Sequence, residues 1–316
     1  MLSRRTVLLT AAASAVAAPA MTSKERVDRV LNGQEADRVP FTHWHHFGLE
    51  KFPGDRLAQA TLDYHRRFRT DLVKVMSDYP YPRPKGEWYE LKVEQNPFPE
   101  QIRALEMIRD GLAGQAHFVE TIFIPWSHAT KMSSKEEVAR LKQESPQKLL
   151  DALEAMAKSE ANHARRAIAA GASGIFLAVD NAIQGILTRE EYKKFSEPFD
   201  RMVLDAVRSA PLNALHLHGD KVHLDLFWKG WPAPIINYSI HATGVGFTAA
   251  RKQFSGVLMG GIDEDKFRKL SDAQMRQQIK DARAACGTKH LLAGGCSVPN
   301  DSTDEELLRV TRALGA

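Results

Sequence analysis

The chain has 316 residues, with 43 Lys and Arg against 39 Asp and Glu, a formal net charge of +4 and only two cysteines. So few cysteines exclude a disulfide scaffold, and the length allows one large barrel domain or two domains of ordinary size. The basic side chains form no patch interleaved with aromatic residues, so the composition does not support nucleic-acid binding.

The first twenty residues predict a removable export signal. Arg4 and Arg5 precede an Ala-rich apolar run that ends at Ala20, which is the layout of a signal peptide, and the paired arginines indicate the twin-arginine route. The run is shorter than the roughly 20 apolar residues that span a bilayer. We therefore expect a signal at residues 1–20, a mature domain at residues 21–316 without a membrane span, and a periplasmic or other extracytoplasmic location. The alternative is a helical N-terminal extension.

Short apolar runs alternate with helical patterns along the mature chain. The alternation predicts parallel βαβ units, and eight runs are the number found in a single (β/α)8 TIM barrel. A doubly wound open sheet is the alternative, with less support because no Gly-rich phosphate loop follows the first run. The predicted strands are residues 39–44, 72–78, 118–125, 174–180, 213–219, 234–240, 256–263 and 290–296, and helical patterns cover residues 56–68, 136–170, 189–209, 272–285 and 304–314.

A helix that precedes the first predicted strand is expected to close the bottom of the barrel. Ser23 can cap this helix, and Gly33 ends it. Val27, Val30 and Leu31 lie on one of its faces and can pack against the sheet. The predicted fold is therefore an α/β barrel with an N-terminal capping helix.

The fifth predicted strand carries two histidines on one face. Side chains alternate along a strand, so His216 and His218 point into the barrel mouth while Leu215 and Leu217 face the helices. Cys296 ends the eighth predicted strand at the same edge of the barrel. Two imidazoles and a thiolate leave one coordination position open, as in catalytic zinc sites. The alternative is a pair of hydrogen-bonded histidines and an inert thiol.

The two cysteines are too far apart to form a disulfide. Cys286 precedes the eighth predicted strand and Cys296 ends it, so about seven strand residues at about 3.3 Å each separate them by roughly 20 Å. A disulfide requires Cα atoms about 5.5 Å apart. We expect Cys296 to be a free thiol that a bound metal protects in an oxidising compartment, and Cys286 to be a packing residue.

Other polar side chains gather at the predicted strand ends, where barrel enzymes carry their chemistry. Asp78 and Asp180 are candidate general bases or acceptors for substrate N–H groups, with helix capping as the alternative. His43 and His45 form a second same-face pair that could supply metal ligands, a base or substrate-binding groups, with loop histidines at the barrel rim as the alternative. We assign catalytic roles to Asp78, Asp180 and His45, and substrate-binding roles to His43, His46, Asn237 and His241.

Several motifs, in their order and spacing, resemble the uroporphyrinogen decarboxylase-like superfamily (URO-D domain). The first begins at Glu25 and the matches continue to the C-terminus, so the resemblance covers the whole mature domain. It implies a (β/α)8 barrel, in agreement with the strand count. The matching segments are residues 25–27, 32–33, 37–40, 70–78, 171–175, 216–219, 260–263 and 294–296.

The resemblance points to two branches of that superfamily. Its decarboxylases remove acetate carboxyl groups from a tetrapyrrole without a cofactor, and hold the substrate with an Arg-rich segment after the first strand. Residues 42–48 contain no arginine, although Asp78 matches the acidic residue that binds pyrrole N–H groups. Its methyltransferases move methyl groups between a corrinoid and a thiol on a zinc held by a His-x-Cys…Cys set. His216 and Cys296 match that set, and His218 replaces its first cysteine.

The leading prediction is an exported, zinc-dependent enzyme for methyl transfer or demethylation. Its substrate is expected to be a small molecule, with a tetrapyrrole or corrinoid as substrate or partner. Because His218 replaces a thiolate, the site favours an activated water or another oxygen or nitrogen ligand over thiol activation. The alternatives are tetrapyrrole decarboxylation, an amidohydrolase-like metallohydrolase that uses His43 and His45, and a non-catalytic tetrapyrrole- or corrinoid-binding protein. Monomer and homodimer both stay open.

Overall fold

A computed structural model describes residues 21–315 of the chain. The predicted export signal, residues 1–20, lies outside the described residues. Within residues 21–315, none of the helices has the length and apolar character that crossing a membrane requires.

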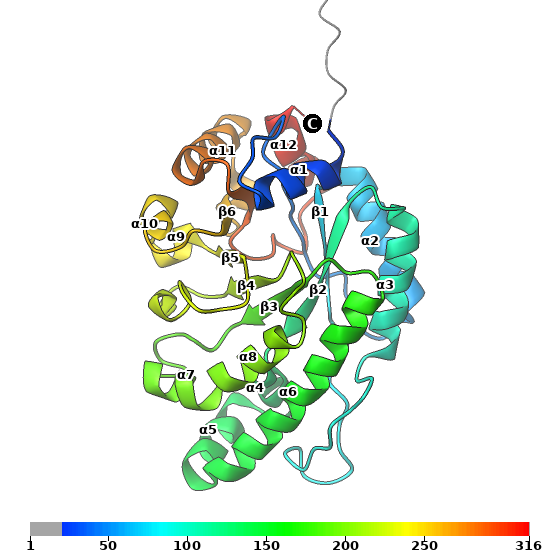
Figure 1. The fold of residues 1–316 in the computed structure, drawn as a ribbon, viewed down its shortest axis with the longest axis vertical. Coiled ribbons are helices and arrows are strands. Elements are labelled where there is room, and N and C mark those ends of the chain that lie inside the picture. Colours follow the sequence, from blue (N-terminus) through cyan, green and yellow to red (C-terminus); the bar gives the residue numbers. More distant parts are fainter. Residues whose placement is uncertain (1–20, 316) are drawn as a thin grey trace, which may run out of the picture.

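Seven parallel strands form one curled sheet in which neighbours along the chain are also neighbours in space (Figure 1). Helices cover its outer face, an arrangement consistent with a TIM-like barrel. Seven of the eight predicted apolar runs are confirmed as strands. The strands are β1 (Leu72–Val75), β2 (His117–Phe123), β3 (Ile175–Val179), β4 (Ala214–Leu217), β5 (Ile235–Tyr238), β6 (Val257–Ile262) and β7 (His290–Gly294).

The first predicted strand, residues 39–44, is the exception. The prediction of eight strands was therefore wrong, because this segment does not form one. This closing segment makes a single parallel bridge, from Phe41 to Leu292 of β7. Thr42 N donates to Leu292 O over 2.9 Å, and Asp71 N donates to Phe41 O over 2.8 Å, so the segment lies between β7 and the start of β1. Pro40 has no N–H to donate, and Phe41 N donates to the Asp71 side chain instead. A continuous ladder therefore cannot form.

Twelve α-helices are assigned within the described part of the chain, and prolines explain where two predicted ones divide. The pattern over residues 136–170 breaks at Pro146, and the pattern over residues 189–209 breaks before Pro198, which occupies the first turn of a new helix. The helices are α1 (Ser23–Leu31), α2 (Gly54–Phe68), α3 (Pro99–Leu112), α4 (Pro125–Met132), α5 (Lys135–Glu144), α6 (Pro146–Ala169), α7 (Arg189–Phe195), α8 (Glu197–Asp205), α9 (Ile240–Thr243), α10 (Phe247–Arg251), α11 (Asp272–Cys286) and α12 (Asp304–Leu314).

Helix α1 packs against the strands from the side where they begin. A capping box of Thr22 and Glu25 starts the helix, one residue before the predicted cap at Ser23. Val27 and Val30 are buried in the cluster that fills the inner face of the sheet. The role of α1 as a cap of the barrel stays a prediction. The strand residues of that cluster include Leu72, Met76, Val119, Phe176, Ala214, Ile235, Val257, Met259, Leu291 and Ala293.

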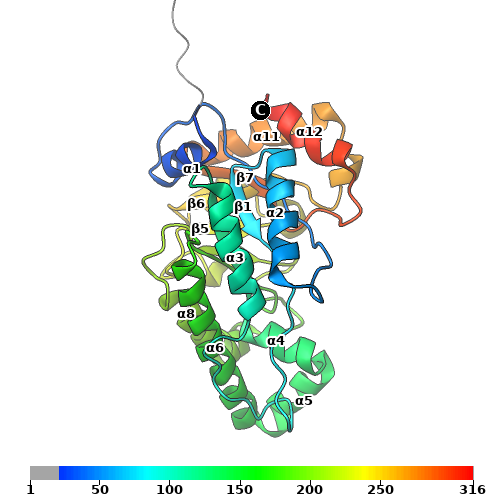
Figure 2. The same cartoon turned by 90° about the vertical axis from the view of Figure 1, so that its right-hand side faces the viewer.

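The opposite end of the sheet, where the strands terminate, faces a projection built by α4, α5 and α6 (Figures 1 and 2). The long coil that precedes α3 lies along α6. Glu94 N donates to Ser159 Oγ over 2.9 Å, and Arg166 Nε donates to Gln95 O over 2.7 Å. These bonds anchor the coil beside the mouth of the sheet.

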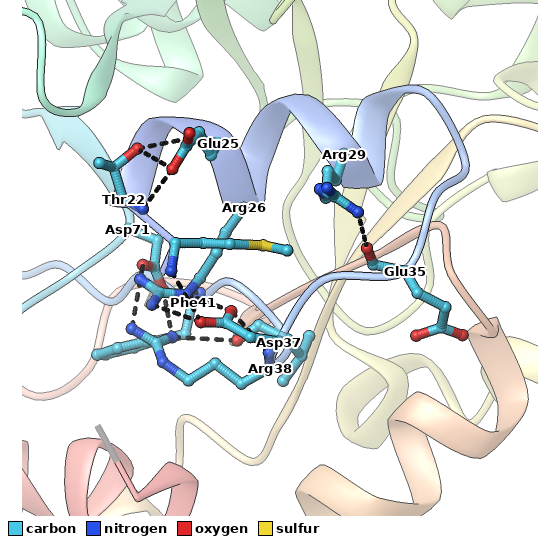
Figure 3. Close-up of polar contacts among 11 residues, drawn as sticks. Thr22, Glu25, Arg26, Arg29, Glu35, Asp37, Arg38, Phe41 and Asp71 are labelled. Atoms are coloured by element: carbon cyan, nitrogen blue, oxygen red, sulfur yellow. Dashed lines mark hydrogen bonds and ion pairs between the residues drawn. The ribbon is translucent and has the colours of Figure 1, made fainter. Parts of the chain in front are cut away.

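A buried ion cluster, the Asp71 clasp, ties α1 and the closing segment to the start of β1 (Figure 3). The Asp71 carboxylate is fully buried and accepts hydrogen bonds from Arg26 Nη1 over 3.1 Å, Arg38 Nη1 over 2.5 Å and Phe41 N over 3.0 Å. Arg26 also binds Asp37, with Nε donating over 2.6 Å. Paired arginines and a backbone donor compensate the desolvation of this carboxylate.

Replacing Asp71 by Ala should lower the free energy of unfolding by about 3–5 kcal/mol, because the buried Arg26 and the partly buried Arg38 each lose an ion-pair partner and the Phe41 N–H loses its acceptor. Urea denaturation followed by circular dichroism measures this. The control, Asp63→Ala, removes an exposed carboxylate that pairs with Arg66, and should change the free energy by no more than about 0.5 kcal/mol. Equal effects of the two substitutions would contradict the role assigned to the clasp.

Candidate functional site

The three predicted metal ligands meet where the strands end. His216 belongs to β4, His218 follows that strand, and Cys296 follows β7. One ligand atom from each lies within 4.8 Å of the other two. Cys296 Sγ is 3.4 Å from His218 Nδ1. The predicted His-x-His and distant Cys therefore form one cluster.

Local packing sets the direction of each side chain in this cluster. Leu215 and Leu217 are fully buried between the sheet and the outer helices, so strand alternation turns His216 to the inner face. There its ring stacks on Phe176, with centroids 5.1 Å apart and an interplanar angle of 24°. Trp44 meets the same imidazole edge-on. These two rings form a floor beneath the cluster.

The turn that carries Cys296 requires glycine. A Cβ at Gly295 would lie 2.2 Å from the Ser239 Cα, which is closer than any real contact. Gly295 N donates to the buried Glu264 carboxylate over 3.0 Å. Close approach and this bond together hold the thiol over the end of the sheet.

The histidines control the protonation of the thiol. Burial raises the pKa of Cys296, but hydrogen bonds and charge from His216 and His218 outweigh burial and lower the pKa to about 4. In return, the hydrogen bond to Cys296 raises the pKa of His218, against the effect of burial. The thiolate is the form that binds metals and attacks electrophiles.

The donor set fits a zinc ion. Zinc–sulfur bonds of about 2.3 Å and zinc–nitrogen bonds of about 2.0–2.1 Å place tetrahedral ligand atoms about 3.5 Å apart. The distance of 3.4 Å between Cys296 Sγ and His218 Nδ1 agrees with that edge, and the other two pairs of ligand atoms lie within 4.8 Å. Three protein ligands leave a fourth position free, which is the arrangement of a catalytic site.

Two predicted carboxylates lie at the same mouth. Asp78 accepts a hydrogen bond from His46 Nδ1 over 2.7 Å, and Asp180 accepts one from Ser127 Oγ over 2.5 Å. Neither caps a helix, because the N-cap of the next helix along the chain is Phe98 in one case and Thr188 in the other. The capping alternative for both residues is therefore wrong.

His43 and His45 share a face, as predicted, but the catalytic role of His45 and the substrate-binding role of His43 are corrected, because that face lies against α2. Trp44 points to the inner face, and its neighbours His43 and His45 point outward to Tyr64 of α2. His43 is buried, its Nδ1 is 2.5 Å from the Tyr64 hydroxyl oxygen, and burial and the charge of His45 lower its pKa to about 3. His45 is half-buried, with Nδ1 hydrogen-bonded to the His46 carbonyl over 2.8 Å. The closing segment places this pair behind the mouth and not inside it.

The two remaining predicted substrate contacts occupy different environments. Asn237 of β5 is fully buried, and its Oδ1 is 2.6 Å from His216 Nδ1. It contacts the candidate ligand itself. His241 lies in α9 at the rim, with Nδ1 3.8 Å from Asp263 Oδ2.

Sequence reasoning missed a buried lysine on the inner face. Lys74 Nζ lies 4.9 Å from the centre of the Trp44 ring and 4.7 Å from that of Phe176, and contacts Met76 Sδ over 3.0 Å. Within residues 21–315 it has no ion-pair partner. Burial lowers its pKa to about 7, although the charges of Cys296, Asp78 and Glu120 act in the opposite direction. A lysine inside an apolar strand was the signal available in the sequence.

A second missed lysine lies nearer the opening. Lys131 Nζ lies 3.4 Å from the centre of the Phe123 ring. Burial lowers its pKa, and the charges of Asp180 and Asp78 partly oppose that effect. The mouth therefore combines two carboxylates with two lysines.

Comparisons with known proteins agree with the sequence resemblance. Residues 80–315 match the family model described as uroporphyrinogen decarboxylase (URO-D). A methyltransferase from Methanosarcina mazei is similar in structure, with a TM-score of 0.77, 16% identity, and coverage of 93% of this chain and 98% of that one. A B12-independent methionine synthase from Shewanella sp. W3-18-1 reaches a TM-score of 0.58 with 11% identity, over 88% of this chain and 93% of that one. At these identities the likeness concerns the fold alone. No curated protein matches the chain.

In metal-free protein, Cys296 should react with iodoacetamide at nearly the same rate from about pH 5 to pH 8, because its thiolate is already formed above a pKa of about 4. Cys286 is the internal control, since burial raises its pKa to about 12. Peptide mass spectrometry of timed samples resolves the two sites. A rate for Cys296 that rises tenfold per pH unit would contradict the assignment.

Lys74→Met should stabilise the protein in a pH-dependent way. The folded chain releases the Lys74 proton near pH 7, whereas the unfolded chain keeps it to about 10.5. Between these values the unfolded state binds more protons than the folded state, so the stability of the wild type rises with pH. Below about pH 7 Lys74 is charged in both states, so the full cost of burying its charge lowers the stability of the wild type. The advantage of the variant should be largest at about pH 6 and shrink by about pH 9, as measured by urea denaturation with a chelator. Lys158→Met, which changes an exposed residue of α6, should show no such trend.

Proposed function

Because this chain belongs to the uroporphyrinogen decarboxylase (URO-D) family, we propose that it is an enzyme that transfers or removes a methyl group with zinc bound to His216, His218 and Cys296. One observation carries the proposal: the three ligand atoms lie within 4.8 Å of one another at the end of the sheet. The methyltransferase of similar fold is a supporting analogy.

Bound zinc would supply a Lewis acid that polarises the methyl acceptor or lowers the pKa of an oxygen bound to it. In methyl transfer the lone pair of the acceptor forms the new bond to carbon, and the donor leaves with the electrons of the old bond. A proton must therefore leave the acceptor. Asp180 is the proposed base, and Ser127 holds its carboxylate in place. Asp78, oriented by His46, is proposed to accept a donor N–H or O–H of the substrate.

The charges around the cluster favour an anionic substrate. Lys74 lies on the floor without an ion-pair partner in the described part of the chain, and Lys131 lies near the opening. A carboxylate, sulfonate or phosphate on the substrate would compensate these charges in a medium of low dielectric. The floor rings Trp44 and Phe176 would exclude water from beneath the reacting group.

Tetrapyrrole decarboxylation is the second candidate, since the family model carries that description and Asp78 lies at the mouth. Residues 42–48 contain no arginine that could bind the carboxylates of such a substrate. The amidohydrolase-like alternative loses its proposed ligands, because His43 and His45 point toward α2. Export by the twin-arginine route and a corrinoid partner stay proposals, based on Arg4, Arg5 and the superfamily resemblance.

The test begins with the metal. Protein purified without a metal-binding tag should contain about one zinc per chain, and Cys296→Ala or His218→Ala should lose it. Cys286→Ala is the matched control, because that cysteine is buried at the end of α11, away from the cluster. It should keep both zinc and activity.

Activity is then followed with methylcobalamin as the methyl donor and a panel of small thiols and acids, with and without an anionic group. The expected result is methyl transfer to anionic acceptors, reduced at least 100-fold in the Cys296→Ala variant. A parallel incubation with uroporphyrinogen tests decarboxylation by product chromatography. Absence of zinc together with decarboxylation of uroporphyrinogen would overturn the proposal in favour of the second candidate.

A further inference from the structure

One buried amide connects the elements that carry the candidate ligands. Asn237 is fully buried in β5, the strand next to β4. Its Oδ1 lies 2.6 Å from His216 Nδ1, and its Nδ2 lies 3.0 Å from Met259 O and 3.0 Å from Gly294 O. No substrate contact is needed to explain this side chain.

The partners determine which way the amide faces. The carbonyl oxygens of Met259 and Gly294 can only accept hydrogen bonds, so the NH2 group of Asn237 must face them, and each of its two hydrogens has one acceptor. The amide oxygen therefore faces His216. An amide oxygen can only accept, so His216 Nδ1 must carry the hydrogen in this bond. Nε2 is then the nitrogen of His216 that is free to bind a metal.

The same amide reaches the other side of the cluster. Gly294 is the last residue of β7 and begins the turn that carries Cys296. Met259 belongs to β6, the strand between β5 and β7. One side chain thus links β4, β6 and β7 through its three hydrogen bonds. A shift of Asn237 would move His216 and the cysteine turn together.

We infer that Asn237 is a positioning residue of the metal site, which holds His216 with Nε2 toward the metal and fixes the turn before Cys296. The inference rests on the proposed zinc site. Partners of this kind, which orient a ligating histidine, contribute 10-fold to 100-fold to metal affinity in known sites.

Two substitutions and a matched control separate positioning from general stability. Asn237→Leu removes the acceptor for His216 and both donors, whereas Asn237→Asp keeps an acceptor for His216. Asn213→Leu is the control, because Asn213 is also fully buried but bonds Ile175 N over 3.1 Å and Val207 O over 2.8 Å, at the opposite end of β4. Competition with a chromophoric chelator measures the zinc affinity of each folded variant.

The zinc dissociation constant should rise by about 10-fold to 100-fold in Asn237→Leu, less in Asn237→Asp, and by less than about threefold in Asn213→Leu. Rescue by the aspartate would show that the acceptor for His216 carries the effect, even though this variant loses two donors. A change below threefold in Asn237→Leu, or an equal loss in Asn213→Leu, would overturn the inference.

Nitrogen NMR of histidine-labelled, metal-free protein gives a readout that does not depend on zinc, with His216→Gln used to assign the signal. The wild type should show a hydrogen-bonded Nδ1–H on His216, which Asn237→Asp retains and Asn237→Leu loses. A wild-type His216 without a hydrogen on Nδ1 overturns the inference even if zinc binds. Failure of the wild type to bind zinc, with the Nδ1–H present, overturns the proposed function and leaves the contact to Asn237 standing.

Discussion

The closure of the curled sheet depends on the hydrogen bonds and ion pairs of the buried Asp71 carboxylate. This carboxylate lies at the start of β1 and binds Arg26 of α1, Arg38 and the backbone N–H of Phe41. Through Phe41 it holds the closing segment between β7 and β1, although that segment pairs with β7 at one residue only. A side chain thus replaces the ladder of hydrogen bonds that a full eighth strand would supply.

Closure of the curl matters because the candidate ligands come from strands that are not neighbours. Three strand spacings of about 4.8 Å would separate β4 from β7 by about 14 Å in a flat sheet. In the curled sheet the ligand atoms of His216, His218 and Cys296 lie within 4.8 Å of one another. The polar residues at the ends of parallel strands lie along one edge of the sheet, and the curl of the sheet brings the two ends of that edge toward each other.

The inner face combines apolar packing with charges that reduce stability. Trp44 and Phe176 support His216 from below and also surround the Lys74 ammonium, which no carboxylate of the described residues pairs. Such a group stabilises a fold poorly and is understood more readily as part of a binding site. In the proposed site, fixed charges and a fixed imidazole would cost no reorganisation on substrate binding.

Much of the architecture followed from the sequence by itself. Short apolar runs between helical patterns predicted eight strands, of which seven are present. Alternation at Leu215, His216 and Leu217 placed the histidine on the inner face, because a buried strand leaves only two directions for side chains. Alternation also held at residues 43–45, but Trp44 takes the inner face there, so His43 and His45 point away from the barrel mouth. Only the tertiary structure decided that Asn237 bonds His216 and that Lys74 lies beneath it, because such contacts join residues far apart in the chain. Their distances depend on how tightly the sheet curls, which no local pattern records.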